Sequence, residues 1–247
     1  MTLLSNFKNL EKAINELLRL DEFPVGWKFV RDESELVGVT LVKRKVYSCQ
    51  MLKIASQGGY VHAATENELS CHHERFIFGM EPLQDIHLET QMKYARTKDI
   101  AKKWFLERVP KTKCRGIMVG PLGKVGFTPD LIVLPVNAWQ ATRCIHAFIH
   151  ENGENFQSVT GPSAIPCAYG AVYVYNTGKP NLVTACSGAR AYGKFEKNDL
   201  SFFMPFQDVD KFIEGLKETH KKEVTVPLLL DLGFPPKPAK SVFEKES

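Results

Sequence analysis

The chain has 247 residues, of which 44% are hydrophobic and 24% are charged, and its formal net charge is +4. This is the balance of an ordinary globular protein with a sizeable core. The basic residues form short runs at 43–45, 102–103 and 221–222 that acidic residues separate, so we expect solvated faces and no nucleic-acid binding. No apolar run is long enough to span a bilayer and the charged N-terminal segment is not a signal peptide, so we expect a cytoplasmic protein with no membrane segment.

Hydrophobic spacing and turn residues predict an alternation of helices and strands. In the first half we expect a helix at 3–20, strands at 25–30 and 37–42, a helix at 49–56 capped by Ser48, a strand at 60–64, a brief helix that begins at Thr65 and carries Cys71, and a helix at 98–109. In the second half we expect buried strands at 115–121 and 130–136, a helix at 137–150 capped by Asn137, a strand at 156–160, a helix that follows Ser163 and runs to Tyr175, strands at 181–186 and 200–204, and a helix at 207–220.

This order of elements favours one α/β domain, a mixed sheet flanked by helices, over residues 1–223. Residues 224–247 form a Pro- and Lys-rich C-terminal tail. The apolar segment of this tail, at 226–232, is a candidate for a homodimer contact or for packing within the chain.

Four of the six cysteines are expected where a helix begins or a strand ends, which are the places where proteins display ligands and nucleophiles. They are Cys49, Cys71, Cys167 and Cys186. The first two lie far from the last two in the sequence, so only the fold can bring them together. A cytoplasmic chain keeps its thiols reduced, which leaves metal binding, catalysis or inert burial as their roles.

The cysteines belong to a set of motifs that resembles one family, the uncharacterised ArCR proteins (domain of unknown function 169) of archaea and anaerobic bacteria. The set is Cys49-Gln50, Cys71, Cys167-Ala168, the segment 177–181 that leads into Cys186 and Arg190, and the segment 204–206. The resemblance covers residues 5–220, and it implies an α/β protein with motif-borne cysteines and no established activity. The chain departs from the family after Cys71, where members tend to have Pro or Gly and this chain has His72-His73-Glu74, a possible extra ligand or base.

The expected positions of these cysteines favour thiolates, because the first turn of a helix presents free N–H groups to a sulfur. Three or four thiolates suit an iron–sulfur cluster, with 4Fe-4S the leading candidate, and they also suit zinc. We therefore expect a metal site at the four cysteines. A cluster with an open iron would act as a Lewis acid or redox centre in anaerobic metabolism. Arg190 would hold a small anionic ligand or substrate, and His72 or His73 would line the pocket.

Three other interpretations remain open at this point, and whether the protein is an enzyme is open with them. The cysteines can be buried apolar residues. One of them can be a catalytic nucleophile, for which Cys71 with the neighbouring histidines is the local candidate. The Gly-rich turns and Arg190 can instead form a metal-free site for a small molecule.

Two further motifs fail on inspection. The Gly-rich segment 120–126 resembles a phosphate loop, but Met118 replaces its first glycine and Val125 replaces the residue that holds magnesium. His146 and His150 share a helix face, but Arg143 on the same face would repel a cation, so we expect a solvated face there. Cys144 is expected in the core, and Cys114 is expected to be incidental.

Overall fold

The computed structural model of the protein describes residues 3–222, and the predicted tail lies outside these residues. Six strands form one sheet in the order β2-β3-β1-β4-β6-β5. Their bounds are β1 Val25–Val30, β2 His62–Thr65, β3 Gly116–Pro121, β4 Leu131–Val136, β5 Asn181–Val183 and β6 Leu200–Pro205. Neighbouring strands pair antiparallel, and within residues 3–222 parallel pairing is limited to isolated bridges that join Leu41 to Ala63 and Val46 to Leu69. The predicted α/β domain with a sheet flanked by helices is confirmed, but the ladders of the expected mixed sheet are antiparallel.

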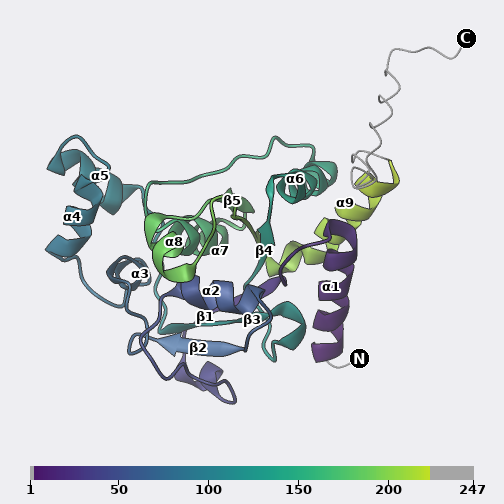
Figure 1. Cartoon of the computed structure of the whole chain (residues 1–247), viewed down its shortest axis with the longest axis horizontal. Coiled ribbons are helices and arrows are strands. Elements are labelled where there is room, and N and C mark those ends of the chain that lie inside the picture. Colours follow the sequence, from purple (N-terminus) through teal and green to yellow (C-terminus); the bar gives the residue numbers. More distant parts are fainter. Residues whose placement is uncertain (1–2, 223–247) are drawn as a thin grey trace, which may run out of the picture.

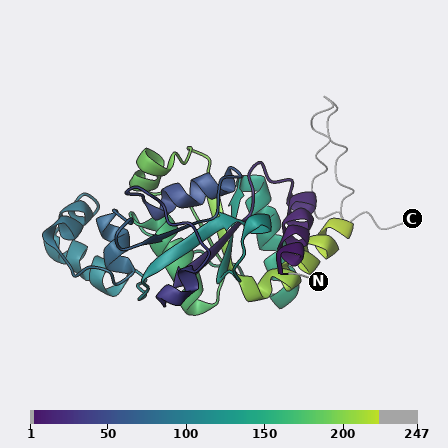
Figure 2. The ribbon, with the colours of Figure 1, turned by 90° about the horizontal axis from the view of Figure 1, so that it is seen from below.

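Helices cover both faces of this sheet (Figure 1). One face packs against α1 Leu3–Leu18, α6 Ala138–Asn152 and α9 Val209–Lys221. The other face packs against α2 Ser48–Ser56, the π-helix η3 Ile165–Val172, α7 Tyr173–Thr177 and α8 Ser187–Gly193. Three more helices lie at one end of this second layer: α3 His72–Ile77, α4 Asp85–Met92 and α5 Lys98–Glu107. Figures 1 and 2 show α4 and α5 at the opposite end of the molecule from α1 and α9.

Strands β3 and β4 are apolar along their whole length, and both of their faces are buried. In β4, Leu131 and Val133 join the core under α2 and η3, whereas Ile132, Leu134 and Val136 join the core under α1, α6 and α9. This period-two alternation divides one apolar run between two cores. It explains why the continuous apolar patterns at 115–121 and 130–136 correctly predicted buried strands.

Helix α6 begins and ends where its capping residues predict. The Asn137 side chain accepts a hydrogen bond from the Gln140 amide at 3.0 Å, and Gly153 ends the helix with a φ of 68°. The prediction of a solvated face on this helix was wrong at Arg143, which is buried and donates to Thr219 Oγ1 and to the Leu216 carbonyl in α9. Arg143 thus ties α6 to α9. Cys144 lies in the core, as expected.

Several predicted elements are absent from the described residues. Segment 37–42 contributes only a bridge at Leu41, and segment 156–160 forms no ladder. The helix expected from Thr65 is a turn in which Glu68 accepts from the Thr65 amide, and the helix itself begins at His72. Helices α4 and α8 were not predicted.

The Gly-rich segment after β3 has a structural role. The amide of Gly123 donates to a carboxylate oxygen of Glu11 in α1 at 2.7 Å, so a side chain of the protein already occupies this donor. None of the helices among residues 3–222 is long and apolar enough to cross a membrane.

Candidate cysteine-lined site

The four cysteines singled out from the sequence line one pocket of about 330 Å³. Each comes from a different element. Cys49 lies in the first turn of α2, Cys71 is the N-cap residue of α3, Cys167 lies in the π-helix η3, and Cys186 is the N-cap residue of α8. Cys186 was expected at the end of a strand, but β5 ends at Val183 and Cys186 begins the next helix instead.

The N-terminus of α2 presents Cys49 to the pocket. The Gln50 side chain accepts a hydrogen bond from the Tyr47 amide at 2.9 Å, so the cap lies one residue before the predicted Ser48. Ser48 is thereby free to bind elsewhere, and both its amide and its hydroxyl donate to Oε2 of Glu74 in α3. This contact joins the helix that carries Cys49 to the helix that Cys71 caps.

Cys167 is held by an unusual stretch of backbone. Ala164 adopts a left-handed conformation with a φ of 54°, and a π-helix follows it. π-helices are rare in proteins as a whole, but those that occur are often found at functional sites. The Cys167 thiol donates to the Ala164 carbonyl at 3.4 Å. The sequence predicted a helix here, but periodicity gives no sign that it is a π-helix.

Asn181 fixes the position of this π-helix. Its side-chain amide donates to the carbonyls of Tyr169 and Val159, each at 2.8 Å, and its carbonyl oxygen accepts from the Val159 amide at 3.0 Å. Asn181 is fully buried, so these bonds replace all contact with water. The motif at 177–181 therefore connects the edge of the sheet to the wall of the cysteine pocket.

Glu74 lies one helical turn after Cys71, and the sequence marked it only as part of His72-His73-Glu74, a possible extra ligand or base. Its side chain is 1% exposed and lines the pocket. Oε2 is bound to Ser48, whereas Oε1 is buried and has no hydrogen-bond partner. Burial raises the pKa of this carboxyl to about 7, although the bonds from Ser48 act in the opposite direction.

The two predicted histidines line the pocket in different ways. His73 packs against the ring of Phe105, and its Nε2 is buried without a partner. Burial, with His87 nearby, lowers the pKa of His73 to about 4, so its ring is neutral. His72 is more exposed, and its Nδ1 lies 3.3 Å from Oε1 of Glu81.

Arg190 does not lie with the other predicted site residues. Its guanidinium donates to the Glu196 carbonyl at 2.6 Å, and Arg190 is absent from the residues that line the pocket. All the lining residues are described, and none of them is Lys or Arg.

Apart from His72 and His73, the ionisable side chains that line the pocket are thiols, tyrosine phenols and one carboxyl, all of which become negative or stay neutral. The pKa values of the Cys49, Cys71 and Cys167 thiols are all raised, first by burial and then by Glu74 and the neighbouring thiols. The amides of His73 and Glu74 act to lower the pKa of Cys71, but burial outweighs them. In the absence of a cation these thiols are protonated at neutral pH.

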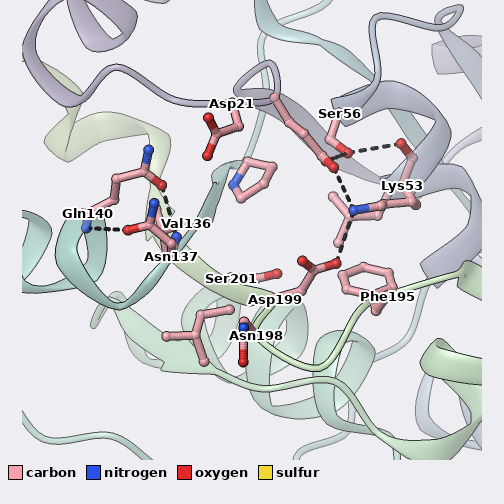
Figure 3. A pocket seen from close by; sticks show the side chains of 14 residues that line it. Asp21, Lys53, Ser56, Val136, Asn137, Gln140, Phe195, Asn198, Asp199 and Ser201 are labelled. Atoms are coloured by element: carbon pink, nitrogen blue, oxygen red, sulfur yellow. Dashed lines mark hydrogen bonds and ion pairs between the residues drawn. The ribbon is translucent and has the colours of Figure 1, made fainter. Parts of the chain in front are cut away.

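A second pocket, without cysteines, lies between α2 and the strand ends of β4 and β6 (Figure 3). Lys53 projects into it and binds Glu22 at 2.5 Å and Asp199 at 3.0 Å, while Ser56 also donates to Glu22. Its buried charge is thus paired within the protein. This pocket differs from the cysteine-lined one, where the buried carboxylate keeps a free oxygen.

Fold and site together define an α/β protein with a six-stranded antiparallel sheet and a cysteine-lined pocket on one face. The chain belongs to the family described as Uncharacterised ArCR, whose model matches residues 13–215, and the predicted resemblance is confirmed. An uncharacterized protein of Methanocaldococcus jannaschii is 23% identical over 214 residues, which cover 83% of this chain and 91% of that protein. No solved structure matches the chain.

Proposed function

We propose that Cys49, Cys71, Cys167 and Cys186 together hold an inorganic cationic group, with an iron–sulfur cluster of the 4Fe-4S type as the leading candidate. The observation that carries this proposal is that the four cysteines come from four separate elements and line one cavity. Cysteines that merely fill the core have no reason to gather at a cavity, and Cys144 in the core under α6 illustrates the difference.

The charges of the pocket support a cationic group. A buried carboxylate without a partner is costly unless a positive charge or a donor lies near it, and Oε1 of Glu74, a residue of the pocket lining, is buried without a hydrogen-bond partner. A bound cation would stabilise this carboxylate and the thiolates at the same time.

The spread of the donors favours a cluster over a single zinc ion. Among residues 3–222, no three His, Cys, Asp or Glu side chains are gathered closely enough to hold one metal ion. Tetrahedral zinc requires its sulfurs at about 2.3 Å from one point. A cluster distributes its thiolate ligands over several irons and so fits donors that surround a cavity of about 330 Å³.

When bound, such a group would supply Lewis-acid or redox chemistry to a molecule in the same pocket. The protein itself supplies the walls of that pocket, among them the rings of Tyr47 and Tyr192, which lie 4.7 Å apart between centroids. We also propose a cytoplasmic location, because free thiols persist in a reducing compartment.

A nucleophilic role for one cysteine finds less support. An activated nucleophile needs a lowered pKa, whereas burial raises the pKa of the Cys49, Cys71 and Cys167 thiols. Among residues 3–222, no histidine ring forms a hydrogen bond with the Cys71 thiol, since the ring of His72 lies beside Glu81 and Nε2 of His73 has no partner.

The test is to purify the protein without oxygen, record its visible spectrum, and assay iron and acid-labile sulfide. We expect a broad brown absorbance with matching iron and sulfide, and loss of most bound iron in Cys49→Ala, Cys167→Ala and Cys186→Ala. The matched control is Cys114→Ala, a half-buried cysteine outside the pocket, which should keep its iron. A colourless protein with neither element after anaerobic reconstitution would refute the cluster.

Alkylation provides a second measurement. Iodoacetamide should label the pocket cysteines only after a chelator has removed the bound group. Rapid labelling of all four in the native, freshly isolated protein would instead favour a metal-free binding site.

A further inference from the structure

We propose that the protein has a ligand site at the β2 edge of the sheet that binds a small amphipathic anion, a molecule with an apolar body and one carboxylate or phosphate group. The site is a cavity of about 570 Å³, a volume typical of small-molecule sites. It shares no lining residue with the cysteine-lined pocket, so the inference goes beyond the proposed function and does not depend on it.

Three parts of the chain line this cavity. Helix α2 contributes Met51 and Ile54, the start of β2 contributes Tyr60 and His62, and the segment 40–46 forms the remaining side. The side chains that line it therefore come from elements that the fold holds in place.

The edge of the sheet explains why a cavity is left here. Strand β2 is the first in the strand order, and beyond it only segment 40–42 is bridged to Ala63 (Figure 1). His62 pairs with Val119 across β2 and β3, so both side chains lie on one face, and Val119 belongs to the core under α2. The cavity thus lies on the α2 face of the sheet, between α2 and segment 40–46.

The apolar surface around the cavity indicates the body of the ligand. Tyr60 is 76% exposed, Leu41 is 41% exposed and Ile54 is 36% exposed, and all three line the cavity. Large apolar side chains that gather in one exposed place mark binding sites. An apolar ligand body would remove this surface from water, which stabilises the complex.

The charges of the lining indicate the head group. Lys43 and Arg44 line the cavity and are exposed, and neither has a salt-bridge partner among residues 3–222. The third residue of this basic run, Lys45, donates instead to the Asn67 carbonyl at 2.6 Å. The lining includes no Asp or Glu, and Lys and Arg are the side chains that bind carboxylate and phosphate.

The test measures binding by NMR to the full-length protein labelled with carbon-13 in its methionine methyl groups. The chain has six methionines, and Met51→Leu assigns the signal of the one that lines the cavity. The probes are naphthylacetate and naphthyl phosphate, the neutral naphthylacetamide, which has the same apolar body, and acetate, which has the head group alone.

We expect both naphthyl anions to shift the Met51 signal and to bind severalfold more tightly than naphthylacetamide, and we expect acetate to have no effect. The signals of Met92 in α4 and of Met204 in the core on the other face should stay in place. Added salt should weaken the anions and leave the amide unchanged.

The variant Lys43→Gln/Arg44→Gln should weaken the two anions by roughly tenfold and bring them close to the amide. Both residues are exposed and unpaired, so this variant is expected to fold. Tyr60→Ala should weaken all three naphthyl probes. The matched control is Lys102→Gln/Lys103→Gln, two exposed lysines of α5, which should bind as wild type does.

Equal binding of the anions and the amide would overturn the proposal, as would anion binding that Lys43→Gln/Arg44→Gln leaves unchanged. A Met51 signal that ignores every probe would also overturn it. If that signal instead moves with protein concentration, the apolar surface is a contact between two copies of the chain and the proposed ligand is wrong.

Discussion

The neighbours His73 and Glu74 make a prediction about stability in the metal-free protein. The pKa of Glu74 is raised to about 7 from an ordinary 4.5, and that of His73 is lowered to about 4 from an ordinary 6.5. Glu74 therefore contributes stability that is full below pH 4.5 and is lost as the pH rises to 7, because the folded state keeps a proton that the unfolded chain releases. His73 contributes stability that is full above pH 6.5 and is lost as the pH falls to 4.

The two contributions have similar size and opposite sign. Each pKa differs from its ordinary value by 2.5, and at about 1.4 kcal/mol for each unit this corresponds to about 3 kcal/mol. Over the pH range between these pKa values, the contributions of Glu74 and His73 therefore cancel. The free energy of unfolding of the wild-type protein should depend little on pH as far as these two residues are concerned. Each single substitution should expose the contribution of the remaining partner.

The assay is urea unfolding of the metal-free protein, in reductant and chelator, at about pH 4.5 and about pH 7.5. When the pH rises from about 4.5 to about 7.5, the free energy of unfolding of Glu74→Gln should increase by about 3 kcal/mol more than that of wild type. Over the same rise, the free energy of unfolding of His73→Asn should decrease by about 3 kcal/mol relative to wild type. Both substitutions keep the approximate size of the side chain. If the two variants follow the wild-type pH dependence to within about 1 kcal/mol, the reasoning from burial is refuted.

Three further substitutions test contacts that shape the site and the fold. Asn181→Asp removes both amide donors beneath the π-helix and should lower the free energy of unfolding, measured by urea titration, by about 2–4 kcal/mol. A decrease of less than about 1 kcal/mol would show that Asn181 does not support the site. Gly215→Ala places a Cβ about 2.5 Å from the Ala147 carbonyl oxygen, which forces α6 and α9 apart. It should lower the free energy of unfolding by about 1–3 kcal/mol, whereas an unchanged melting temperature would show that the two helices shift without cost. Lys53→Met leaves two carboxylates without their shared cation and should lower the free energy of unfolding by about 1–3 kcal/mol, and by less at high salt. Lys53→Arg should be closer to wild type in stability, and equal stability of the two variants would mean that the positive charge is unimportant.

The sequence predicted best those elements whose signals are local. The strand Val25–Val30 and the helix capped by Asn137 follow from alternation, capping and a terminal glycine, all of which act within a few residues. Segments 37–42 and 156–160 have the composition of strands, but composition does not determine whether a partner strand is available. Side chains hold the second segment instead, since Ser158 donates to the Leu182 carbonyl and Asn181 binds Val159.

The site was predictable in its cysteines and not in its charge. Positions near expected helix starts pointed to Cys49, Cys71, Cys167 and Cys186, and the fold does bring them to one pocket. The sequence marked Glu74 only within the run His72-His73-Glu74, and its burial and its bonds to Ser48, a residue distant in sequence, follow from the fold alone. The motif position of Arg190 did not reveal that one N–H of its guanidinium donates to the Glu196 carbonyl, and its role in holding an anion stays a prediction.

More than half of the chain separates Cys49 from Cys186, and yet both contribute to one pocket. During synthesis the pocket is incomplete until the segment that carries Cys186 has emerged and α8 has docked beside α2. A group bound by all four sulfurs would therefore be inserted only after the chain has folded, and it would then close a very long loop. Binding of such a group would therefore indicate that the chain has folded completely. Loss of the group would lower the stability of both halves of the chain at the same time.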